Sequence, residues 1–416
     1  MNYAFPHITH LSEILDAIAG SQADEGGEFA VARRPWGTVV QYLFMYDQTF
    51  PDPATAPDER TARRWALRRE CRGIVFDPQS GDIRARRYHK FFTVGQRPET
   101  ERQHIDLSRP HVMLDKLDGS MVSPVPVLGG GHLWLTKMGE SDAAKQASAF
   151  VQSQRGKRDY EGFAKAETAR GRTPIFEFMA DANRIVVAQP EPQLVLTAVR
   201  DIHTGAYATL DDMRGLGDQF GVPVVGVFQA PRGDLGALLE AVRTLKNAEG
   251  CVVRFDSGHM LKLKGEWYLQ LHGAKDALAH EKDVVAMVLA DNTDDVLGIL
   301  PAQGKAQLQA FHDGVLSGIA ASVQRALDIA ADGRTRFGDD RKSFAGWLPG
   351  ELKRVDATEL MDAVFAAYGG GDPKAVRERI VRRIENHLGS GPRVALVRGL
   401  WGGQPWVPLA FEDDAA

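Results

Sequence analysis

Short runs of apolar, β-branched and aromatic residues recur along the chain as far as His272. Leu11–Gly20 has helical apolar spacing, whereas Thr38–Met45 and Gly73–Asp77 have the composition of strands. Further strand-like runs are VMLDK, MVSPVPVL, LWLTKM, PIFEFM, RIVVAQ, LVLTAV, CVVRF and HMLKLK, with helical stretches near 141–170 and 234–247. A doubly wound sheet would alternate strands and helices regularly, so the pattern predicts a mixed antiparallel α+β fold. The triplet Gly129–Gly131 is expected to form a hairpin turn.

The pattern changes after His272. Residues 275–390 are rich in alanine and place apolar residues at helical spacing, as in VVAMVLA and IAASVQRALDIAA, and strand-like runs are scarce there. We therefore expect two domains, 1–272 with strands and helices and 273–416 with helices. The segment after about residue 390, GPRVALVRGLWGGQPW with its acidic end EDDAA, is expected to be irregular.

The composition is that of an ordinary globular protein. The N-terminus MNYAFPHITH lacks a secretory pattern, and no apolar stretch approaches the roughly 18 residues of a membrane span. We therefore expect a cytoplasmic protein without a membrane partner. The two cysteines, Cys71 and Cys251, fit a reducing compartment and exclude a disulfide framework or a cysteine-built zinc site. The twelve histidines show no metal-ligand spacing.

Basic side chains are concentrated between residues 60 and 90. Ten basic and three acidic residues there give a local charge of +7, whereas the whole chain carries −5. Clustering of this kind suits a phosphate-rich partner such as nucleic acid. A solvated charged face is the alternative interpretation of the same residues.

The motif KLDGS at residues 116–120 is the first candidate for chemistry. Alone, it is also typical of a strand-to-turn junction with a surface lysine. Downstream, Glu177 lies within the apolar strand IFEFM, and Glu249 opens the strand CVVRF. Lys262 and Lys264 alternate along a third strand and so face the same side. A carboxylate between phenylalanines needs a partner, and two lysines facing a cleft would clamp phosphates.

These residue types suit the transfer of a nucleotide to a lysine. At an ordinary pKa near 10.4, less than about 0.1% of a lysine is neutral at pH 7, so the attacking amine must be activated. Neighbouring cations or a metal ion lower the pKa of such an amine and stabilise charge on phosphate oxygens. Mg²⁺ keeps most of its waters and needs one or two carboxylates. Asp118, Glu177 and Glu249 are the candidates, acting through water.

The same residues resemble the motifs of the covalent nucleotidyltransferases, and specifically of the RNA ligase 1 family typified by the phage T4 enzyme. The resemblance runs from about Tyr46 to Leu388. Similar segments are ECRGIVFD with Arg72, HKFF with Lys90, KLDGSMVS with Lys116, LTKMG with Lys137, FEFMADANRIVVA with Glu177, EGCVVRF with Glu249, and LKLKGEWYLQLH with Lys262 and Lys264. TDDV near Asp294 and DRKSFA also have counterparts, and Tyr46 stands where the family has a nucleotide-contacting tyrosine.

This resemblance implies an antiparallel-sheet, ATP-grasp-like nucleotidyltransferase domain at 1–272 and an all-helical domain that selects RNA or tRNA at 273–416. Lys116 would take AMP from ATP with Mg²⁺ or Mn²⁺ and pass it to an RNA 5′-phosphate, which a 3′-hydroxyl then attacks. The binding of ATP would involve Tyr46, Arg72, Lys90, Lys137, Glu177, Glu249, Lys262 and Lys264. Asp294 is implied as a fourth metal ligand beside Asp118, Glu177 and Glu249.

The RNA substrate stays open at this point. Broken tRNA is one candidate, and a separate end-healing kinase and phosphatase is expected because no phosphate-loop motif of a kinase occurs in the chain. The segment between Tyr46 and Arg72 departs from the family as a longer, arginine-rich loop that would hold a different RNA end. The alternatives are a DNA ligase, a capping guanylyltransferase, an inactive RNA-binding homologue and an enzyme that adenylylates another protein.

Overall fold

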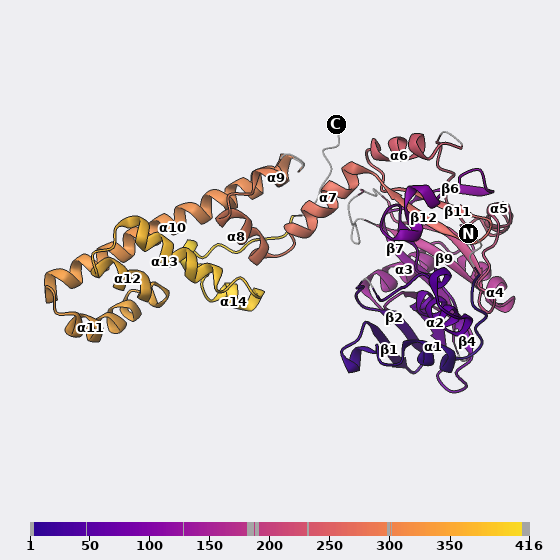
Figure 1. Ribbon diagram of the computed structural model, residues 1–416, viewed down its shortest axis with the longest axis horizontal. Coiled ribbons are helices and arrows are strands. Elements are labelled where there is room, and N and C mark those ends of the chain that lie inside the picture. The colour runs from indigo at the N-terminus through magenta and orange to yellow at the C-terminus, as the bar shows by residue number, and fades with distance from the viewer. Residues whose placement is uncertain are drawn as a thin grey trace. The chain divides into compact units, whose positions relative to one another are not determined.

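The computed structural model describes residues 4–46, 48–127, 129–180, 187, 191–230, 233–297, 300 and 302–409. It divides into two compact units, Met1–Tyr268 and Leu269–Ala416. The boundary falls within helix α7, Glu266–Ala277, which also contains the predicted boundary at 272. In the described residues every strand belongs to the first unit (Figure 1).

The described strands of the first unit form three four-stranded sheets. Their bounds are β1 Phe29–Arg34, β2 Gly37–Tyr42, β3 Arg72–Phe76, β4 Ile83–Ala85, β5 Phe92–Thr93, β6 His111–Lys116, β7 Ser120–Pro126, β8 His132–Thr136, β9 Arg172–Met179, β10 Gln193–Asp201, β11 Gly250–Phe255 and β12 Met260–Lys264. The strand orders are β1-β2-β3-β4, β10-β9-β7-β8 and β5-β12-β11-β6. Neighbours pair antiparallel, apart from the parallel pair β5–β12. The predicted antiparallel α+β fold is confirmed.

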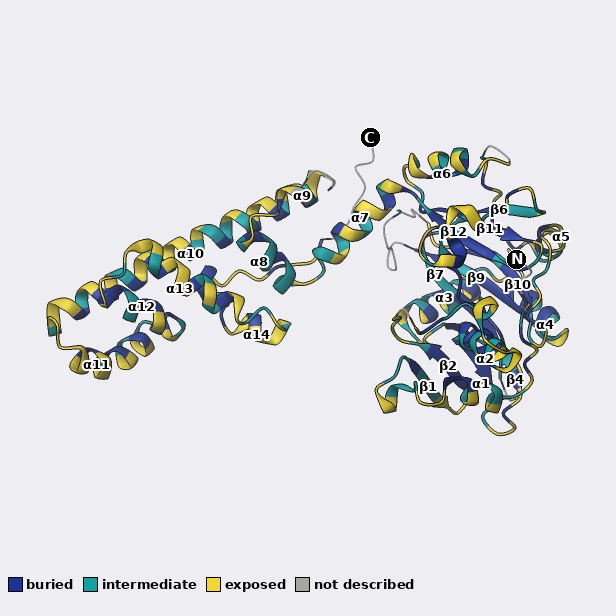
Figure 2. Ribbon diagram, viewed as in Figure 1, coloured by how far each residue is buried: buried dark blue, intermediate teal, exposed yellow. Residues whose placement is uncertain are grey.

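Helices pack against each sheet and close its core. Their bounds are α1 Leu11–Ile18, α2 Glu59–Glu70, α3 Asp142–Ser153, α4 Tyr160–Ala169, α5 Leu210–Phe220 and α6 Leu235–Arg243. Apolar side chains of α1 and α2 are buried with β2 and β3, those of α3 to α5 with the second sheet, and those of α6 with β11 and β12. The strands are accordingly the most buried part of the unit (Figure 2).

Several sequence predictions for this unit need correction. The arginine-rich segment predicted as a loop contains helix α2, which begins after Asp58, whose carboxylate accepts from the amide of Thr61 at 2.8 Å. The helix was not predicted because it contains many arginines, and its apolar face is narrow, with Ala66 and Leu67 as its buried apolar residues. Strand β2 ends at Tyr42, helix α5 was not predicted, and the helical stretch 141–170 consists of two helices. The predicted strand RIVVAQ lies almost wholly outside the described residues.

The second unit is helical, as predicted. Its helices are α8 Glu281–Leu289, α9 Asp294–Leu297, α10 Ala302–Phe337, α11 Arg341–Arg354, α12 Met361–Tyr368, α13 Pro373–Glu385 and α14 Gly391–Ala395. No helix in the described ranges is long and apolar enough to cross a membrane.

The segment after residue 390 is not irregular throughout, which corrects the prediction. As far as it is described, it forms α14 and a 3₁₀ turn at Arg398–Trp401, and its last described residues, 402–409, are without regular structure. Trp401 is 1% exposed, and the indole of Trp406 donates to the carbonyl of Leu278 at 2.7 Å. Glycines and prolines interrupt the helical period here, but the tryptophans still bury their rings in the helical core.

Candidate active site

The register of three neighbouring strands brings two lysines together. Gly250, the first residue of β11, pairs with Lys116 at the end of β6 and with Lys264 at the end of β12. Gly250 has φ +149°, and a Cβ there would lie 2.0 Å from the carbonyl oxygen of Leu263. Only glycine therefore fits between the strands that carry the two lysines.

Glu249, immediately before β11, joins both lysines electrostatically. Its carboxylate oxygens lie 2.6 Å from Lys116 Nζ and 3.0 Å from Lys264 Nζ. Glu249 is 4% exposed, so these ion pairs are largely shielded from water. Buried charges of this kind need such partners, and the carboxylate in turn fixes the position of the Lys116 amine.

The KLDG turn connects two sheets. Lys116 ends β6 of the third sheet, and Ser120 begins β7 of the second, where it pairs with Phe178 of β9. A Cβ on Gly119 would lie 2.3 Å from the carbonyl oxygen of Phe178, so the turn packs directly on β9. Met121 pairs with Glu177 in the same ladder. The turn therefore places Lys116 close to the end of β9 that carries Glu177.

A cavity of about 480 Å³ opens at this junction. Its charged lining residues are Arg72, Asp115, Lys116, Lys137, Glu177, Arg254 and Lys262. An apolar wall completes it with Leu114, Met121, Val225, Val252 and Met260. A cavity of this size with an apolar wall and converging charges is typical of a small-molecule site, and here it suits a base, a sugar and phosphates.

Cations in and beside the cavity perturb each other. Burial lowers the pKa of Lys262 to about 6, helped by the charges of Arg72, Lys90 and the other lysines. Burial and the charges of Arg72 and Arg97 lower the pKa of Lys90 to about 8. Within the described residues, two buried nitrogens of Arg72, Nε and Nη1, have no hydrogen-bond partner. A bound polyanion would supply negative charge to these lysines and hydrogen-bond acceptors to Arg72.

Binding of a triphosphate is therefore expected to take up protons. Negative charge raises the pKa of Lys262 and Lys90, so at pH 8 each amine that was neutral gains a proton on binding. Uptake of about one to two protons per chain is expected at pH 8, and almost none below about pH 5, where both amines are already charged. Calorimetric titration with inorganic triphosphate, in buffers of different ionisation enthalpy, measures it. Binding heats that do not depend on the buffer at pH 8 would refute this account.

Glu177 is the carboxyl group best suited to a cation. Burial, together with the nearby charges of Glu249 and Asp118, raises its pKa to about 7 despite the opposing effect of Lys116. No three acidic or histidine residues of the described chain gather closely enough to enclose a metal ion. The residues therefore fit an ion that takes most of its ligands from water and phosphate and is held by one or two carboxylates.

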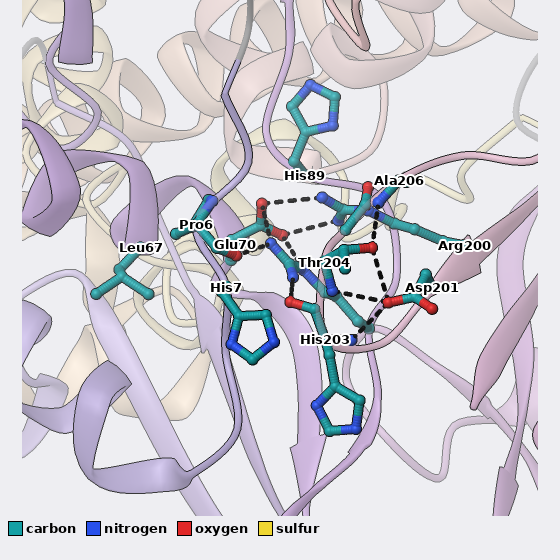
Figure 3. A network of polar contacts seen from close by, with 12 residues as sticks. Pro6, His7, Leu67, Glu70, His89, Arg200, Asp201, His203, Thr204 and Ala206 are labelled. Carbon is teal, nitrogen blue, oxygen red and sulfur yellow. Dashed lines mark hydrogen bonds and ion pairs between the residues drawn. The ribbon is translucent and has the colours of Figure 1, made fainter.

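A buried ion network supports the walls of the site. Glu70, at the end of α2, binds Arg86 at 2.9 Å and Arg200 of β10 at 2.7 Å, and all three side chains are 0% exposed. Figure 3 shows Glu70 facing Arg200, with the segment at Pro6 beside it. Burial alone would raise the pKa of Glu70, but the charges of Arg200 and Arg86 hold this pKa well below its ordinary range. Because Arg72, the first residue of β3, lies two residues after Glu70, the network holds the chain at the start of this strand.

Most of the basic cluster is engaged within the protein. Arg63 binds Glu13 at 2.5 Å, Arg69 binds Glu99 at 2.7 Å, and Arg64 donates to the carbonyl of Ala17 at 3.1 Å. These side chains fasten α2 to the N-terminal segment and to the turn near Glu99. The charge cluster is thus largely structural, apart from Arg72 and Lys90.

Besides Lys90, Glu249 and Lys264, the predicted site residues that are not in the cavity lining are Tyr46, Asp118 and Asp294. Tyr46 does not line the cavity and is 63% exposed. Asp118 is 4% exposed and accepts hydrogen bonds from the hydroxyl of Tyr268 and the amide of Val187, at 2.8 and 2.7 Å. Asp294 belongs to the helical unit and is exposed. Their roles as nucleotide or metal contacts stay predictions.

Residues that the sequence did not reveal complete the site. The ring of Tyr42 lies 4.8 Å from Lys90 Nζ and 5.0 Å from Lys137 Nζ, and Phe91 lies 4.6 Å from Lys262 Nζ. Arg254 lines the cavity and is 6% exposed. The alternation of side chains along CVVRF and HKFF could have indicated that Arg254 and Phe91 face the site. No sequence pattern indicated that Tyr42, rather than Tyr46, lies beside the lysines.

Comparisons with known proteins show what the chain is similar to. Residues 70–268, which hold most of the site, match the sequence model of a family described as RNA ligase. A Thermovibrio ammonificans protein provisionally named an RNA ligase is 30% identical over 270 residues, and the match covers 62% of this chain and 64% of that protein. RNA ligase 1 of bacteriophage TS2126 is 26% identical over 384 residues, covering 88% and 90% of the two chains.

Among solved structures, an archaeal ATP-dependent RNA ligase is similar with a TM-score of 0.44 and 15% identity, over 83% of this chain and 86% of that one. The family match contains the KLDG motif, both downstream glutamates and both strand lysines. The match to the phage enzyme extends into the helical unit. Residues 70–268 are thus similar to a family of RNA ligases, and most of the chain is similar to a phage RNA ligase 1.

Proposed function

We propose that this protein is an ATP-dependent RNA ligase that joins 5′-phosphate and 3′-hydroxyl RNA ends through AMP bound covalently to Lys116. One observation carries the proposal. The Lys116 amine lies at a cavity with an apolar wall, and its nitrogen is 2.6 Å from a carboxylate oxygen of buried Glu249. The cavity is lined by more cationic than anionic side chains. That arrangement suits a lysine that attacks a nucleotide phosphate. The ATP-grasp-like domain type is part of the same proposal.

In the first step, the Lys116 amine attacks the α-phosphate of ATP. A phosphorus–nitrogen bond forms, the bond to pyrophosphate breaks, and the amine loses a proton. Glu249 orients the amine and lies close enough to accept that proton, and Lys262 and Arg72 neutralise charge on the phosphate oxygens. Lys90 and Lys264 supply further positive charge next to them. The apolar wall leaves room for adenine away from these charges.

In the second step, the RNA 5′-phosphate displaces Lys116, and AMP passes to the RNA. In the third, an RNA 3′-hydroxyl attacks that activated phosphate and AMP leaves. A divalent ion, Mg²⁺ or Mn²⁺, would be held by Glu177 with water and would add positive charge at the reacting phosphate. Because Glu249 and Asp118 already accept hydrogen bonds from protein groups, we assign them to positioning and Glu177 to the metal.

The substrate is tested most directly by sealing. The full chain is incubated with ATP and a panel of nicked tRNAs, linear RNAs and DNAs that carry 5′-phosphate and 3′-hydroxyl ends. We expect sealing of RNA ends and little sealing of DNA. Sealing of DNA alone would indicate a DNA ligase, and stronger lysine labelling by GTP than by ATP would indicate a capping enzyme. Labelling that passes to another protein would indicate a protein-modifying enzyme.

We further propose that the helical unit selects structured RNA, with broken tRNA as the candidate, after a separate kinase and phosphatase has healed its ends. A chain that ends at Ala277 retains α7 and with it the Tyr268–Asp118 hydrogen bond. It also keeps every apolar cluster of the first unit, since these clusters draw on no residue beyond Leu263. The truncated chain is therefore expected to fold and to form the lysine adduct.

Its preference for nicked tRNA over linear RNA is expected to disappear. The measurement is the ratio of the two sealing rates, at one salt concentration because phosphate contacts make RNA affinity salt-dependent. An unchanged ratio would place substrate choice in the first unit instead.

A further inference from the structure

Arg87 is a buried arginine without an acidic partner in the described part of the chain. It is 2% exposed, and burial lowers its pKa to about 10. Its hydrogen bonds go to two backbone carbonyls, because one guanidinium nitrogen donates to Gly73 and the other donates to Leu135 at 3.3 Å. A buried charge that no carboxylate compensates makes a fold less stable. Such a residue is therefore expected to serve the function of the protein rather than its stability.

The two carbonyls belong to strands of different sheets. Gly73 is the second residue of β3 in the first sheet, and Leu135 lies near the end of β8 in the second. The two strands meet closely, because a Cβ on Gly73 would lie 2.8 Å from the Cα of Lys137. Arg87 thus ties the start of β3 to the end of β8 where the two sheets touch.

Each of these strand ends carries a cation of the cavity. Arg72 begins β3, Lys137 directly follows β8, and both line the cavity. Within the described residues neither side chain has a hydrogen bond or an ion pair. Aromatic rings lie beside them instead, with Arg72 5.6 Å from the ring of Phe91 and Lys137 5.0 Å from the ring of Tyr42. The positions of these two charges therefore depend on the positions of their strands.

We propose that Arg87 is a positioning residue that sets the distance between Arg72 and Lys137, so that both cations fit the phosphates of one bound nucleotide. The proposal rests on the proposed ligase function and adds a residue to its ATP-binding step. Arg87 does not line the cavity, so it acts through the backbone of the two strands. Its planar guanidinium presents N–H groups at a fixed separation, which suits a bridge between two carbonyls better than the single ammonium of a lysine does.

The test replaces Arg87 in the full chain in two ways. Arg87→Met keeps a long buried side chain but removes the charge and both hydrogen bonds, whereas Arg87→Lys keeps the charge but not the planar fork. Arg84→Met is the matched control, because Arg84 lies in the same segment and donates to Pro126 rather than to β8. Calorimetry measures the binding of inorganic triphosphate and of adenosine. Single-turnover label transfer gives the maximal rate of adduct formation and the ATP concentration at half that rate.

Both Arg87 variants are expected to bind triphosphate about tenfold more weakly than wild type, the value of about one hydrogen bond between charged groups. The ATP concentration at half the maximal rate should rise by a similar factor. The maximal rate should change less, since Lys116 and Glu249 keep their places on other strands. Adenosine should bind as it does to wild type, because it has no phosphates. Arg87→Met should melt no lower than wild type, since it no longer buries a charge without an acidic partner.

Three results would overturn the proposal. Unchanged triphosphate binding by Arg87→Met would show that the two cations do not depend on this bridge. Full recovery in Arg87→Lys would assign the effect to charge rather than to bridging. A lower melting temperature with equal losses for triphosphate and adenosine would indicate a structural role. Failure of the wild type to form any adduct would instead refute the ligase function, and the triphosphate comparison would still decide the role of Arg87 because it involves no reaction.

Discussion

Replacement of Lys116 by alanine is expected to abolish both the lysine–AMP adduct and ATP-dependent sealing. Lys116 stands where two sheets meet, and its amine is held at 2.6 Å by Glu249. The Lys116 amine is the nucleophile of the proposed first step, and no binding interaction can replace a missing nucleophile. Sealing of RNA that already carries a 5′-adenylate should persist, because the third step does not use the amine.

The matched control for this change is Lys145→Ala. Lys145 is an exposed lysine on α3 whose amine pairs only loosely with Asp142, at 3.1 Å. It should retain adduct formation and sealing. Persistence of radioactive label in Lys116→Ala would remove Lys116 from the mechanism. Loss of activity toward adenylated RNA as well would show that the substitution damages more than the nucleophile.

Lys262→Ala and Lys264→Ala are each expected to slow adduct formation by at least ~100-fold, since each removes a positive charge close to the reacting phosphates. Lys262 lines the cavity, and Lys264 shares the Glu249 carboxylate with Lys116. The measurement is the rate of label transfer from ATP in a single turnover. Arg84→Ala is the control, because Arg84 donates to the carbonyl of Pro126 at 3.1 Å and does not line the cavity.

A stability measurement separates lost chemistry from lost structure. The pKa of Lys262 is about 6 in the folded protein and near the ordinary value of about 10.4 when unfolded. The amine therefore destabilises the fold below pH 10, most strongly below pH 6, because the unfolded chain binds the proton more tightly. Lys262→Met should raise the melting temperature at pH 7 and still lose adduct formation. A lower melting temperature together with lost activity would indicate a structural role.

Local patterns in the sequence predicted the strands that carry the site. The alternation in LKLKG predicted that Lys262 and Lys264 share a face, and Leu261 and Leu263, which alternate with them, are buried in the core. The order of motifs further predicted that Glu177 and Glu249 act with Lys116. Strand register was beyond such reasoning, because pairing Gly250 with both Lys116 and Lys264 depends on how segments far apart in sequence assemble.

The failures have a common physical cause. Charged side chains reveal nothing by themselves about their partners, so the arginines of α2 suggested RNA contacts although Arg63 and Arg69 bind Glu13 and Glu99. The role of Tyr46 was inferred from its order in the chain and stays a prediction, and sequence order gave no sign that the ring beside Lys137 belongs to Tyr42. Trp401 was missed in the same way, because an apolar ring without helical spacing can still be buried by tertiary packing.

The most direct test of the central claim is the covalent adduct itself. Full-length protein is incubated with ATP and Mg²⁺ without RNA, its intact mass is measured, and the modified peptide is sequenced. We predict the added mass of one AMP, located on Lys116, stable to alkali and released by acid as expected for a phosphoramidate. An unmodified chain, or AMP on any other residue, would contradict the account.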